Sequence, residues 1–132
     1  MANTPDDLKY TKDHEWVRST GKSVVRVGIT DHAQRQLGDI VFVELPKKGD
    51  RLEGSEPFGS VESVKSVSEL YMPLSGTIAT VNEDLNDEPE RVNDDPYEDG
   101  WMIEVTIADQ SALNGLLTAA EYRDYISAES AD

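Results

Sequence analysis

The stretch GDIVFV (residues 38–43) is echoed loosely by GTIATV (residues 76–81), 38 residues further along the chain. Each is a short run that begins at a glycine and is rich in β-branched or aromatic residues, which is typical of a strand entered from a turn. A second echo links DRL and PF (50–52, 57–58) with ERV and PY (90–92, 96–97), at offsets of 40 and 39 residues. Two similar units of strand, turn and strand predict a mainly β protein, a two-fold-related β-sandwich or flattened barrel. The alternative is that β-domains reuse turn chemistry and the echoes arise by chance.

Strands and one short helix are expected in the segment that leads up to Gly38, where the first unit begins. Residues 16–17 and 23–29 have the β-branched and aromatic content of strands, with Gly21 and Lys22 as the turn between them. Thr30 is a good N-cap, and Gly38 stands where a helix ends in a residue that tolerates positive φ. The pattern therefore predicts a two-turn helix over 31–37.

The end of the chain predicts one more strand and a second helix. The segment WMIEV (101–105) is typical of a buried strand. Thr118 and Glu121 have the spacing of a capping box, in which a side chain and the backbone exchange hydrogen bonds in the first helical turn. This predicts a C-terminal helix near 119–128 that packs on the sheet through Tyr122, Tyr125 and Ile126.

The connector between the two units is SVESVKSVSELYMPLSG (residues 60–76). Its apolar residues recur at every third position, which fits one stripe of a helix: Val61, Val64, Val67 and Leu70. Serine and valine are poor helix formers, however, and suit a β-hairpin. We therefore predict an exposed hairpin with Val64 and Lys65 at its tip.

The acidic segment 82–99 has some features of a calcium loop. Asp84, Asn86 and Glu88 alternate as in an EF-hand, but Pro89 stands where that loop needs glycine, and no glutamate stands at the twelfth position. We interpret the segment as a solvated loop.

Charge and composition exclude several classes of function. The chain has 132 residues, with 12 Lys or Arg and 27 Asp or Glu, and its formal net charge is −15. So acidic a protein is a poor partner for nucleic acid or for an anionic membrane. Cysteine is absent, which excludes disulfides, thiolate catalysis and Cys-ligated metal sites. The length predicts a single domain over 1–132, with a core over about 9–107 and a C-terminal helical extension over about 111–128.

The N-terminal stretch MANTPDDLKY lacks the basic and apolar regions of a secretory signal. No run of the chain approaches the ~20 apolar residues of a membrane span. No Arg-rich transit peptide is present. We therefore expect a protein of the bacterial cytoplasm, although a processed protein of the mitochondrial matrix would have the same features.

Lys65 is the most conspicuous candidate functional residue. It is the only basic residue between Arg51 and Arg91, and it lies at the predicted hairpin tip among Glu53, Glu56, Glu62 and Glu69. A hairpin tip presents an amine to a modifying enzyme with little steric obstruction. The alternative is an ordinary solvated lysine, since most lysines are exposed and inert.

Metal and serine chemistry have weaker support. His14 and His32 have acidic neighbours, but a metal site needs three or four converging ligands, and two histidines of unknown separation do not supply them. We therefore predict no metal site and interpret His14 as a residue that orients a loop. No G-x-S-x-G motif is present. The sequence predicts no catalytic residue.

Four segments resemble the H proteins of the glycine cleavage system, which are relatives of lipoyl and biotinyl carrier domains. They are YTKDHEWV (10–17), VGITDHAQRQLGDIVFVELPKKGD (27–50), SVESVKSVSELYMPLSG (60–76) and VNDDPYEDGWM (92–102). The resemblance covers most of the chain from 9 to 107, and ESVK with the downstream P-x-S-G is specific. It implies that Lys65 is amide-linked to lipoic acid, that the fold is a barrel-sandwich hybrid, and that the protein is a covalent carrier and not an enzyme.

The resemblance also implies partners and a groove. The lipoyl arm would shuttle the aminomethyl group of glycine among glycine decarboxylase (a pyridoxal-phosphate enzyme), a tetrahydrofolate-dependent aminomethyltransferase and dihydrolipoamide dehydrogenase, after a lipoyl-attaching enzyme had modified the lysine. A groove that shields the arm from water is implied at Glu15, Ile29, Ala33, Leu37 and Glu69. A buried carboxylate there would pair with the loaded amine. The alternative is that Ile29 and Leu37 are core residues and that both glutamates are solvated.

Two other functions stay open. A lipoyl relay to 2-oxoacid dehydrogenase complexes keeps the fold and the cofactor, whereas a non-covalent acidic binding module makes Lys65 incidental. A biotin carrier is disfavoured, because Val64 and Ser66 flank Lys65 where biotin carriers usually have methionines. The negative charge favours docking on basic patches, at rates that fall as salt rises.

Overall fold

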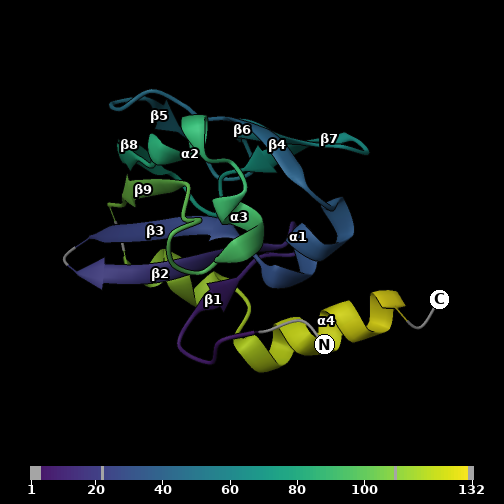
Figure 1. Ribbon diagram of the computed structural model, residues 1–132. Coiled ribbons are helices and arrows are strands. Elements are labelled where there is room, and N and C mark those ends of the chain that lie inside the picture. The colour runs from purple at the N-terminus through teal and green to yellow at the C-terminus, as the bar shows by residue number, and fades with distance from the viewer. Residues whose placement is uncertain (1–3, 22, 109, 131–132) are drawn as a thin grey trace.

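The structure is a computed structural model that describes residues 4–21, 23–108 and 110–130, and these fold into two antiparallel sheets (Figure 1). The larger sheet has the order β1 (Lys9–Tyr10), β2 (Glu15–Gly21), β3 (Val24–Ile29), β9 (Ile103–Thr106), β8 (Gly76–Val81) and β5 (Arg51–Leu52). The smaller sheet has the order β4 (Ile40–Glu44), β6 (Pro57–Ser63) and β7 (Val67–Tyr71). The helices are α1 (Asp31–Leu37), α2 (Asp84–Asp87), α3 (Arg91–Asp94), a 3₁₀ helix (Gln110–Gly115) and α4 (Ala119–Ser130).

The main hydrophobic core lies between the two sheets. Val27 of β3 and Ile78 of β8 come from the larger sheet, and Val43 of β4 and Val61 of β6 come from the smaller one; all four are almost completely buried. The predicted mainly β, two-sheet architecture is confirmed. Within the described residues, the two sheets stay separate and do not close into a barrel.

The predicted first strand pair consists of β2 and β3. They pair antiparallel from Glu15 opposite Ile29 to Gly21 opposite Val24, so β2 is longer than the predicted strand over 16–17. Gly21 belongs to β2, and Lys22, the other residue of the predicted turn, lies outside the described residues.

The first sequence echo corresponds to one strand in each sheet, but the second echo has no structural counterpart. GDIVFV contains the start of β4, and GTIATV is β8. In contrast, Arg51 lies in β5, whereas Arg91 opens the helical turn α3, whose backbone hydrogen bonds run from Asp94 N to Glu90 O and from Asp95 N to Arg91 O. The same triplet of an acidic residue, an arginine and an apolar residue is therefore extended in one place and helical in the other. Its conformation depends on tertiary contacts, since β5 is a strand because it pairs with β8.

The prediction of a solvated loop over 82–99 is wrong. The segment forms α2 and α3, and the side chains of Leu85 and Val92 are completely buried in the main core, while Tyr97 is buried in a second cluster. The acidic residues remain outside. The physical reason is that a few apolar residues at suitable spacing anchor the segment, whatever the charge of the residues between them.

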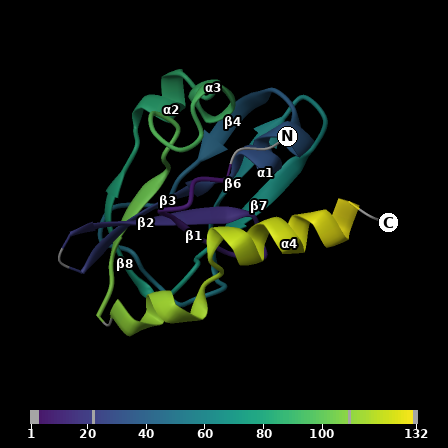
Figure 2. The same ribbon diagram turned by 90° about the horizontal axis from the view of Figure 1, so that it is seen from below.

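The predicted terminal elements are confirmed, with β9 beginning two residues later than the predicted strand. Glu121 Oε1 accepts a hydrogen bond from the Thr118 N–H (2.9 Å) and Thr118 Oγ1 accepts one from the Glu121 N–H (3.2 Å), which is the predicted capping box of α4. The helix packs against β1 (Figure 2). The rings of Tyr122 and Tyr10 stack there, with centroids 4.7 Å apart. No described helix combines the length and the apolar character needed to span a membrane.

Candidate functional site

The predicted hairpin is formed by β6 and β7, and its turn is Val64-Lys65-Ser66. Ser63 Oγ accepts hydrogen bonds from the backbone N–H groups of Lys65 and Ser66, each at 3.1 Å. The Val64 N–H donates to the carbonyl oxygen of Asp39 at 3.1 Å, which ties the turn to the segment before β4. The backbone of the tip is therefore held firmly, while the side chain of Lys65 is exposed and makes no ion pair with the described residues.

The stem of Lys65 lies over Gly38, the residue that ends α1. Gly38 has φ +82°, a value that L side chains rarely adopt, and a Cβ added there would lie 3.3 Å from Lys65 Cε. Asn93 of α3 holds this turn in place, because its Nδ2 donates to the Gly38 carbonyl (2.9 Å) and its Oδ1 accepts from the Ile40 N–H (2.8 Å). The acidic segment thus contributes Asn93 as a support for the tip, a role that the sequence analysis missed.

The exposed apolar side chains gather on the smaller sheet and its turn. Among the described residues, the exposed large hydrophobic side chains are Val41 and Phe42 of β4, Val64 of the turn and Val67 of β7. Val64 directly precedes Lys65, Val67 follows it by two positions, and each is about two thirds exposed, at 67% and 65%. Apolar groups left in water around one residue are typical of a surface that another protein contacts.

A cavity of about 290 Å³ lies between α1, the hairpin and the turn before β2. Its apolar lining consists of Ile29, Ala33, Leu37, Val61 and Leu70, and its polar lining of Asp13, His14, Gln36, Ser68 and Glu69. Four residues predicted for a groove line this cavity, namely Ile29, Ala33, Leu37 and Glu69. The fifth, Glu15, does not line it. Val61 and Ser68, which stand directly opposite each other in the hairpin, were not predicted as lining residues.

Glu15 lies in the protein interior, so the alternative that it is solvated is wrong. Its side chain is 1% exposed, its Oε2 accepts a hydrogen bond from the Tyr71 N–H at 2.8 Å, and its Oε1 accepts one from Thr11 Oγ1 at 3.4 Å. Burial raises the pKa of the Glu15 carboxyl to about 8, although the Tyr71 N–H favours the charged form. Glu15 thus connects β2 to the end of the hairpin strand β7 from inside.

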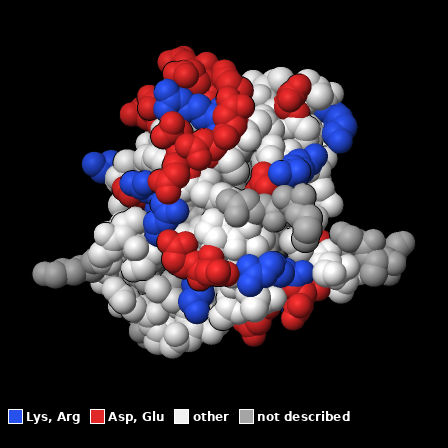
Figure 3. All heavy atoms as spheres, turned by 60° about the horizontal axis from the view of Figure 1, so that its bottom comes forward, with Lys and Arg blue, Asp and Glu red and all other residues white. Residues whose placement is uncertain are grey.

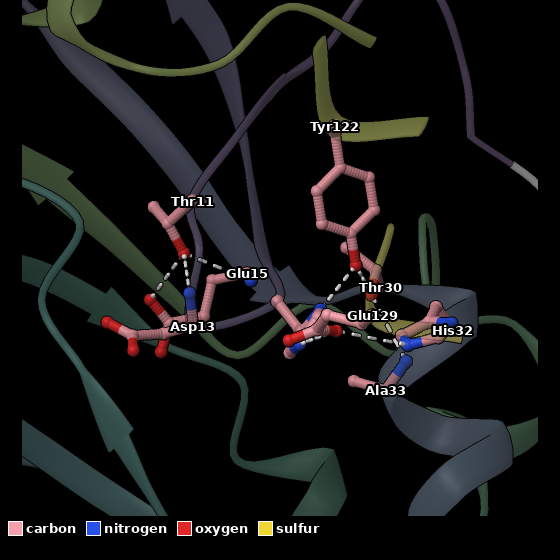
Figure 4. A network of polar contacts seen from close by, with 9 residues as sticks. Thr11, Asp13, Glu15, Thr30, His32, Ala33, Tyr122 and Glu129 are labelled. Atoms are coloured by element: carbon pink, nitrogen blue, oxygen red, sulfur yellow. Dashed lines mark hydrogen bonds and ion pairs between the residues drawn. The ribbon is translucent and has the colours of Figure 1, made fainter. Parts of the chain in front are cut away.

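The turn between β1 and β2 places His14 beside the cavity. Thr11 Oγ1 accepts hydrogen bonds from the N–H groups of Asp13 (3.2 Å) and Glu15 (3.3 Å), and Figure 4 shows these three residues together. His14 has φ +67°, and its carbonyl oxygen accepts a hydrogen bond from the Thr30 N–H at 3.0 Å. A non-glycine residue with positive φ is uncommon, and such strain is more frequent at functional sites.

The two histidines, whose separation was unknown from the sequence, lie together. Their ring centroids are 4.9 Å apart, and Glu129 of α4 approaches both, with its Oε1 3.3 Å from His14 Nε2 and 4.0 Å from His32 Nε2. Figure 4 shows Glu129 beside His32. Burial lowers the pKa of His14, while the charge of Glu129 acts in the opposite direction. Only the tertiary packing of α4 brings the third residue, more than ninety positions further along the chain, to this place.

The surface of α2 and α3 is strongly acidic. Residues 83–99 include nine acidic residues and one arginine, and Figure 3 shows acidic side chains gathered over this part of the molecule. Arg91 contacts Glu88 (3.1 Å) and Asp84 (3.7 Å), and Arg18 of β2 contacts Glu98 (3.1 Å). Most of the acidic groups make no ion pair with the described residues. Such a patch attracts a basic surface over a distance of about one Debye length, near 8–10 Å at physiological salt.

Comparison with known protein families gives one matching family model. Residues 8–129 match the model described as glycine cleavage H-protein. This range includes the hairpin, the cavity and α4 up to Glu129.

Individual relatives agree with the family model. The chain is 58% identical over 129 residues to the glycine cleavage system H protein of Halalkalibacterium halodurans, covering 98% of this chain and 100% of that protein. It is 60% identical over 125 residues to the protein of the same name from Geobacillus kaustophilus, covering 95% and 98%. Among solved structures, it is similar to a glycine cleavage system H protein from Mycobacterium marinum, with a TM-score of 0.84, 42% identity, and coverage of 93% of this chain and 98% of that chain.

Proposed function

The chain belongs to the glycine cleavage H-protein family, and from this premise we propose that Lys65 is the residue that carries its lipoyl group. As a member of the family, the protein is the lipoyl carrier of the glycine cleavage system. The observation that carries the assignment to Lys65 is its position: an exposed amine at the tip of a firmly held turn, without an ion pair to the described residues.

The surroundings of Lys65 fit a long tethered group. Gly38 leaves room for the lysine stem, since a side chain at that position would press against Lys65 Cε. The cavity begins at Val61 and Ser68, three or four residues from Lys65 along the two strands, which corresponds to roughly 10–13 Å of extended chain. A lipoyl group supplies a redox-active dithiolane that accepts the aminomethyl group. The tether keeps it near the protein at an effective concentration on the order of millimolar.

We infer that the cavity is the groove in which the arm is protected. Ile29, Ala33 and Leu37 present apolar groups that exclude water from its wall. Glu69 and Asp13 bring carboxyl groups to the same cavity, and a carboxylate there would accept hydrogen bonds from the ammonium of the carried group. Glu15, which does not line the cavity, would hold the hairpin strand β7 in place, because its carboxyl accepts the N–H of Tyr71 at the end of that strand.

The surface features support docking on larger enzymes. We propose glycine decarboxylase, aminomethyltransferase, dihydrolipoamide dehydrogenase and a lipoyl-attaching enzyme as the partners, with this chain supplying no catalytic residue of its own. The apolar side chains next to Lys65 suit close contact, and the acidic surface of α2 and α3 suits long-range attraction to basic patches. The cytoplasm is the proposed location, in keeping with the bacterial relatives.

Intact mass spectrometry after incubation with a lipoate ligase, lipoate and ATP tests the assignment. The unmodified chain should gain one lipoyl group, Lys65→Arg should gain none, and Lys48→Arg, which removes another exposed lysine, should behave like the original chain. Modification of Lys65→Arg to the same extent as the original, or no modification of the original, would show that the carrier assignment to Lys65 is wrong.

A second variant tests the groove separately from the attachment. Ala33→Leu adds atoms on the cavity wall, so it should leave the lipoyl gain unchanged and raise the rate at which water releases the carried aminomethyl group. The matched control is Val41→Leu, an exposed position outside the cavity. An unchanged release rate in Ala33→Leu, with correct folding, would exclude this cavity as the protecting groove.

A further inference from the structure

Three potential metal ligands from distant parts of the chain converge beside the cavity. They are His14 in the turn before β2, His32 at the start of α1 and Glu129 near the end of α4. Each contributes one nitrogen or oxygen atom, and the three atoms lie within 4.8 Å of one another. We propose that these residues bind a divalent transition-metal ion, with Zn²⁺ as the best-fitting ion.

One of the three ligand-to-ligand distances already matches a zinc site, and the others, which lie within 4.8 Å, would shorten by small side-chain movements. Zinc bonds of about 2.0–2.2 Å in a tetrahedral arrangement place neighbouring ligand atoms roughly 3.3–3.6 Å apart. His14 Nε2 and Glu129 Oε1 are already 3.3 Å apart, and His32 Nε2 is 4.0 Å from the same oxygen. The two imidazoles are largely enclosed, with side chains 18% and 12% exposed, whereas the Glu129 side chain is 40% exposed and has room to adjust.

The Nε2 atom of His32 is a second and independent sign of a missing ligand. It is buried and has no hydrogen-bond partner among the described residues, since the 4.0 Å to Glu129 exceeds hydrogen-bond distance. Buried polar atoms without a partner are rare and unfavourable in folded proteins. A metal ion placed between the three residues would satisfy this nitrogen.

The contacts of His14 are those of a supported metal ligand. His14 Nδ1 is 2.8 Å from the Tyr122 hydroxyl, which is 2.7 Å from Thr30 Oγ1 (Figure 4). When Nδ1–H donates to Tyr122 and Tyr122 donates to Thr30, the lone pair of His14 Nε2 faces Glu129 and His32. A partner that fixes the tautomer of a ligating histidine in this way is a regular feature of metal sites.

The donor set selects the class of metal. Two imidazole nitrogens and one carboxylate oxygen suit Zn²⁺ and other late first-row ions, whereas Mg²⁺ and Ca²⁺ prefer oxygen ligands alone. Three protein ligands leave one position of a tetrahedral ion for water. The bound ion would join the β1–β2 turn, α1 and the end of α4, and it would stand beside the cavity because His14 is part of the cavity wall.

Nuclear magnetic resonance of the imidazole nitrogens tests the proposal directly. The chain has two histidines, so their signals are simple to assign in the full-length protein prepared without a polyhistidine tag. Addition of Zn²⁺ should shift the Nε2 signals of both histidines together and saturate at one ion per chain, in the lipoylated and unlipoylated protein alike. Millimolar Mg²⁺ should not reverse the shifts.

Variants separate this site from nonspecific binding to an acidic surface. Glu129→Gln and His32→Gln should each weaken Zn²⁺ binding about tenfold or more, and Tyr122→Phe about tenfold, in isothermal titration calorimetry. Asp124→Asn removes one acidic group from the exposed surface of the same helix and should leave the affinity unchanged. Glu129→Gln lies at the exposed end of α4, so the test does not depend on variants that disturb folding.

Two results would overturn the proposal. One is Zn²⁺ binding that Glu129→Gln leaves intact or that Mg²⁺ displaces, since this indicates adventitious binding to acidic side chains. The other is the absence of any shift at the two histidines on addition of Zn²⁺. Neither result would affect the assignment of Lys65, because the lipoylation assay requires no ion at this site.

Discussion

A serine hydroxyl holds the β6–β7 turn and a threonine hydroxyl holds the β1–β2 turn, each by accepting two backbone N–H hydrogen bonds. In the first turn, Lys65 points to solvent and makes no ion pair with the described residues. In the second turn, His14 is covered by α4 and contacts Tyr122 and Glu129. Local turn chemistry therefore positions a side chain, whereas the packing of a distant segment decides whether that side chain is exposed or enclosed.

The largest expected difference between the two regions is in their contribution to stability. Tyr122→Ala removes a completely buried ring that stacks on Tyr10, and should lower the free energy of unfolding by about 4 kcal/mol. Val64→Ala at the exposed tip should change it by less than about 0.5 kcal/mol. Urea unfolding of both variants measures this, and similar losses in the two would contradict the comparison.

The buried carboxyl behind the cavity should have the next largest effect. Glu15→Ala leaves a void and an unpaired Tyr71 N–H, and should lower the free energy of unfolding at pH 7 by about 3 kcal/mol. Glu15→Gln keeps the shape of the side chain and an acceptor oxygen, so it should lower the free energy of unfolding by less than about 1 kcal/mol. If the glutamine variant is as unstable as the alanine variant, the carboxylate charge is required, contrary to its burial.

Alkaline pH should lower the free energy of unfolding through the buried tyrosines. Burial raises the pKa of Tyr97 to about 12, and it raises the pKa values of Tyr10 and Tyr122 as well. The folded protein then holds these protons more tightly than the unfolded chain, so stability present below pH 10 is lost as the pH rises from 10 toward 12. For Tyr97 alone the loss is about 2 kcal/mol.

Unfolding measured between pH 8 and pH 11.5 tests the pH effect, with Tyr97→Phe as the comparison. The variant loses the hydroxyl that accepts the Asp31 N–H, so it should be less stable at pH 8 by about 1 kcal/mol and show a shallower decline at high pH. An equally steep decline in the variant would exclude Tyr97 as a contributor.

The smallest effect is expected from the turn hydroxyls themselves. Ser63→Ala removes a buried hydroxyl that accepts two N–H groups. Because these N–H groups belong to the exposed residues Lys65 and Ser66, water can reach them, so the change should cost about 0.5–1 kcal/mol while slowing lipoylation by loosening the position of Lys65. Thr11→Ala removes the equivalent acceptor, together with a partner of Glu15, and should cost about 1–2 kcal/mol without slowing lipoylation. The ligase rate and urea unfolding, measured on both variants, distinguish the two turns, and a slowed lipoylation in Thr11→Ala would contradict this assignment.

Several features were predictable because their causes lie within a few residues. The caps of α1 at Thr30 and Gly38, the capping box of α4 and the hairpin around Lys65 follow from side chain to backbone hydrogen bonds and from the backbone preferences of single residues. The predicted site residues Ile29, Ala33, Leu37 and Glu69 line one cavity, and they came from resemblance to a family, since no local pattern brings α1 and β7 together.

Other features were not predicted because they lie in strongly charged segments or depend on residues far apart in the sequence. Leu85 and Val92 anchor an acidic segment that was interpreted as a loop, and Glu15 has the sequence context of a surface residue while it is buried. Asn93, which supports the turn under Lys65, has no local signal of that role.

Local sequence was enough to predict the alternation of strands and turns, the helix ends and the lysine at a hairpin tip, because short-range hydrogen bonding and side-chain preference act between neighbours in the chain. The packing of distant segments encloses Glu15, forms the cavity beside the hairpin, and brings His14 and His32 to Glu129. The burial of a side chain, and the meeting of residues from distant segments, depend on how those segments pack. Hydrophobic packing is non-directional, so no single position of the sequence indicates which segments will meet.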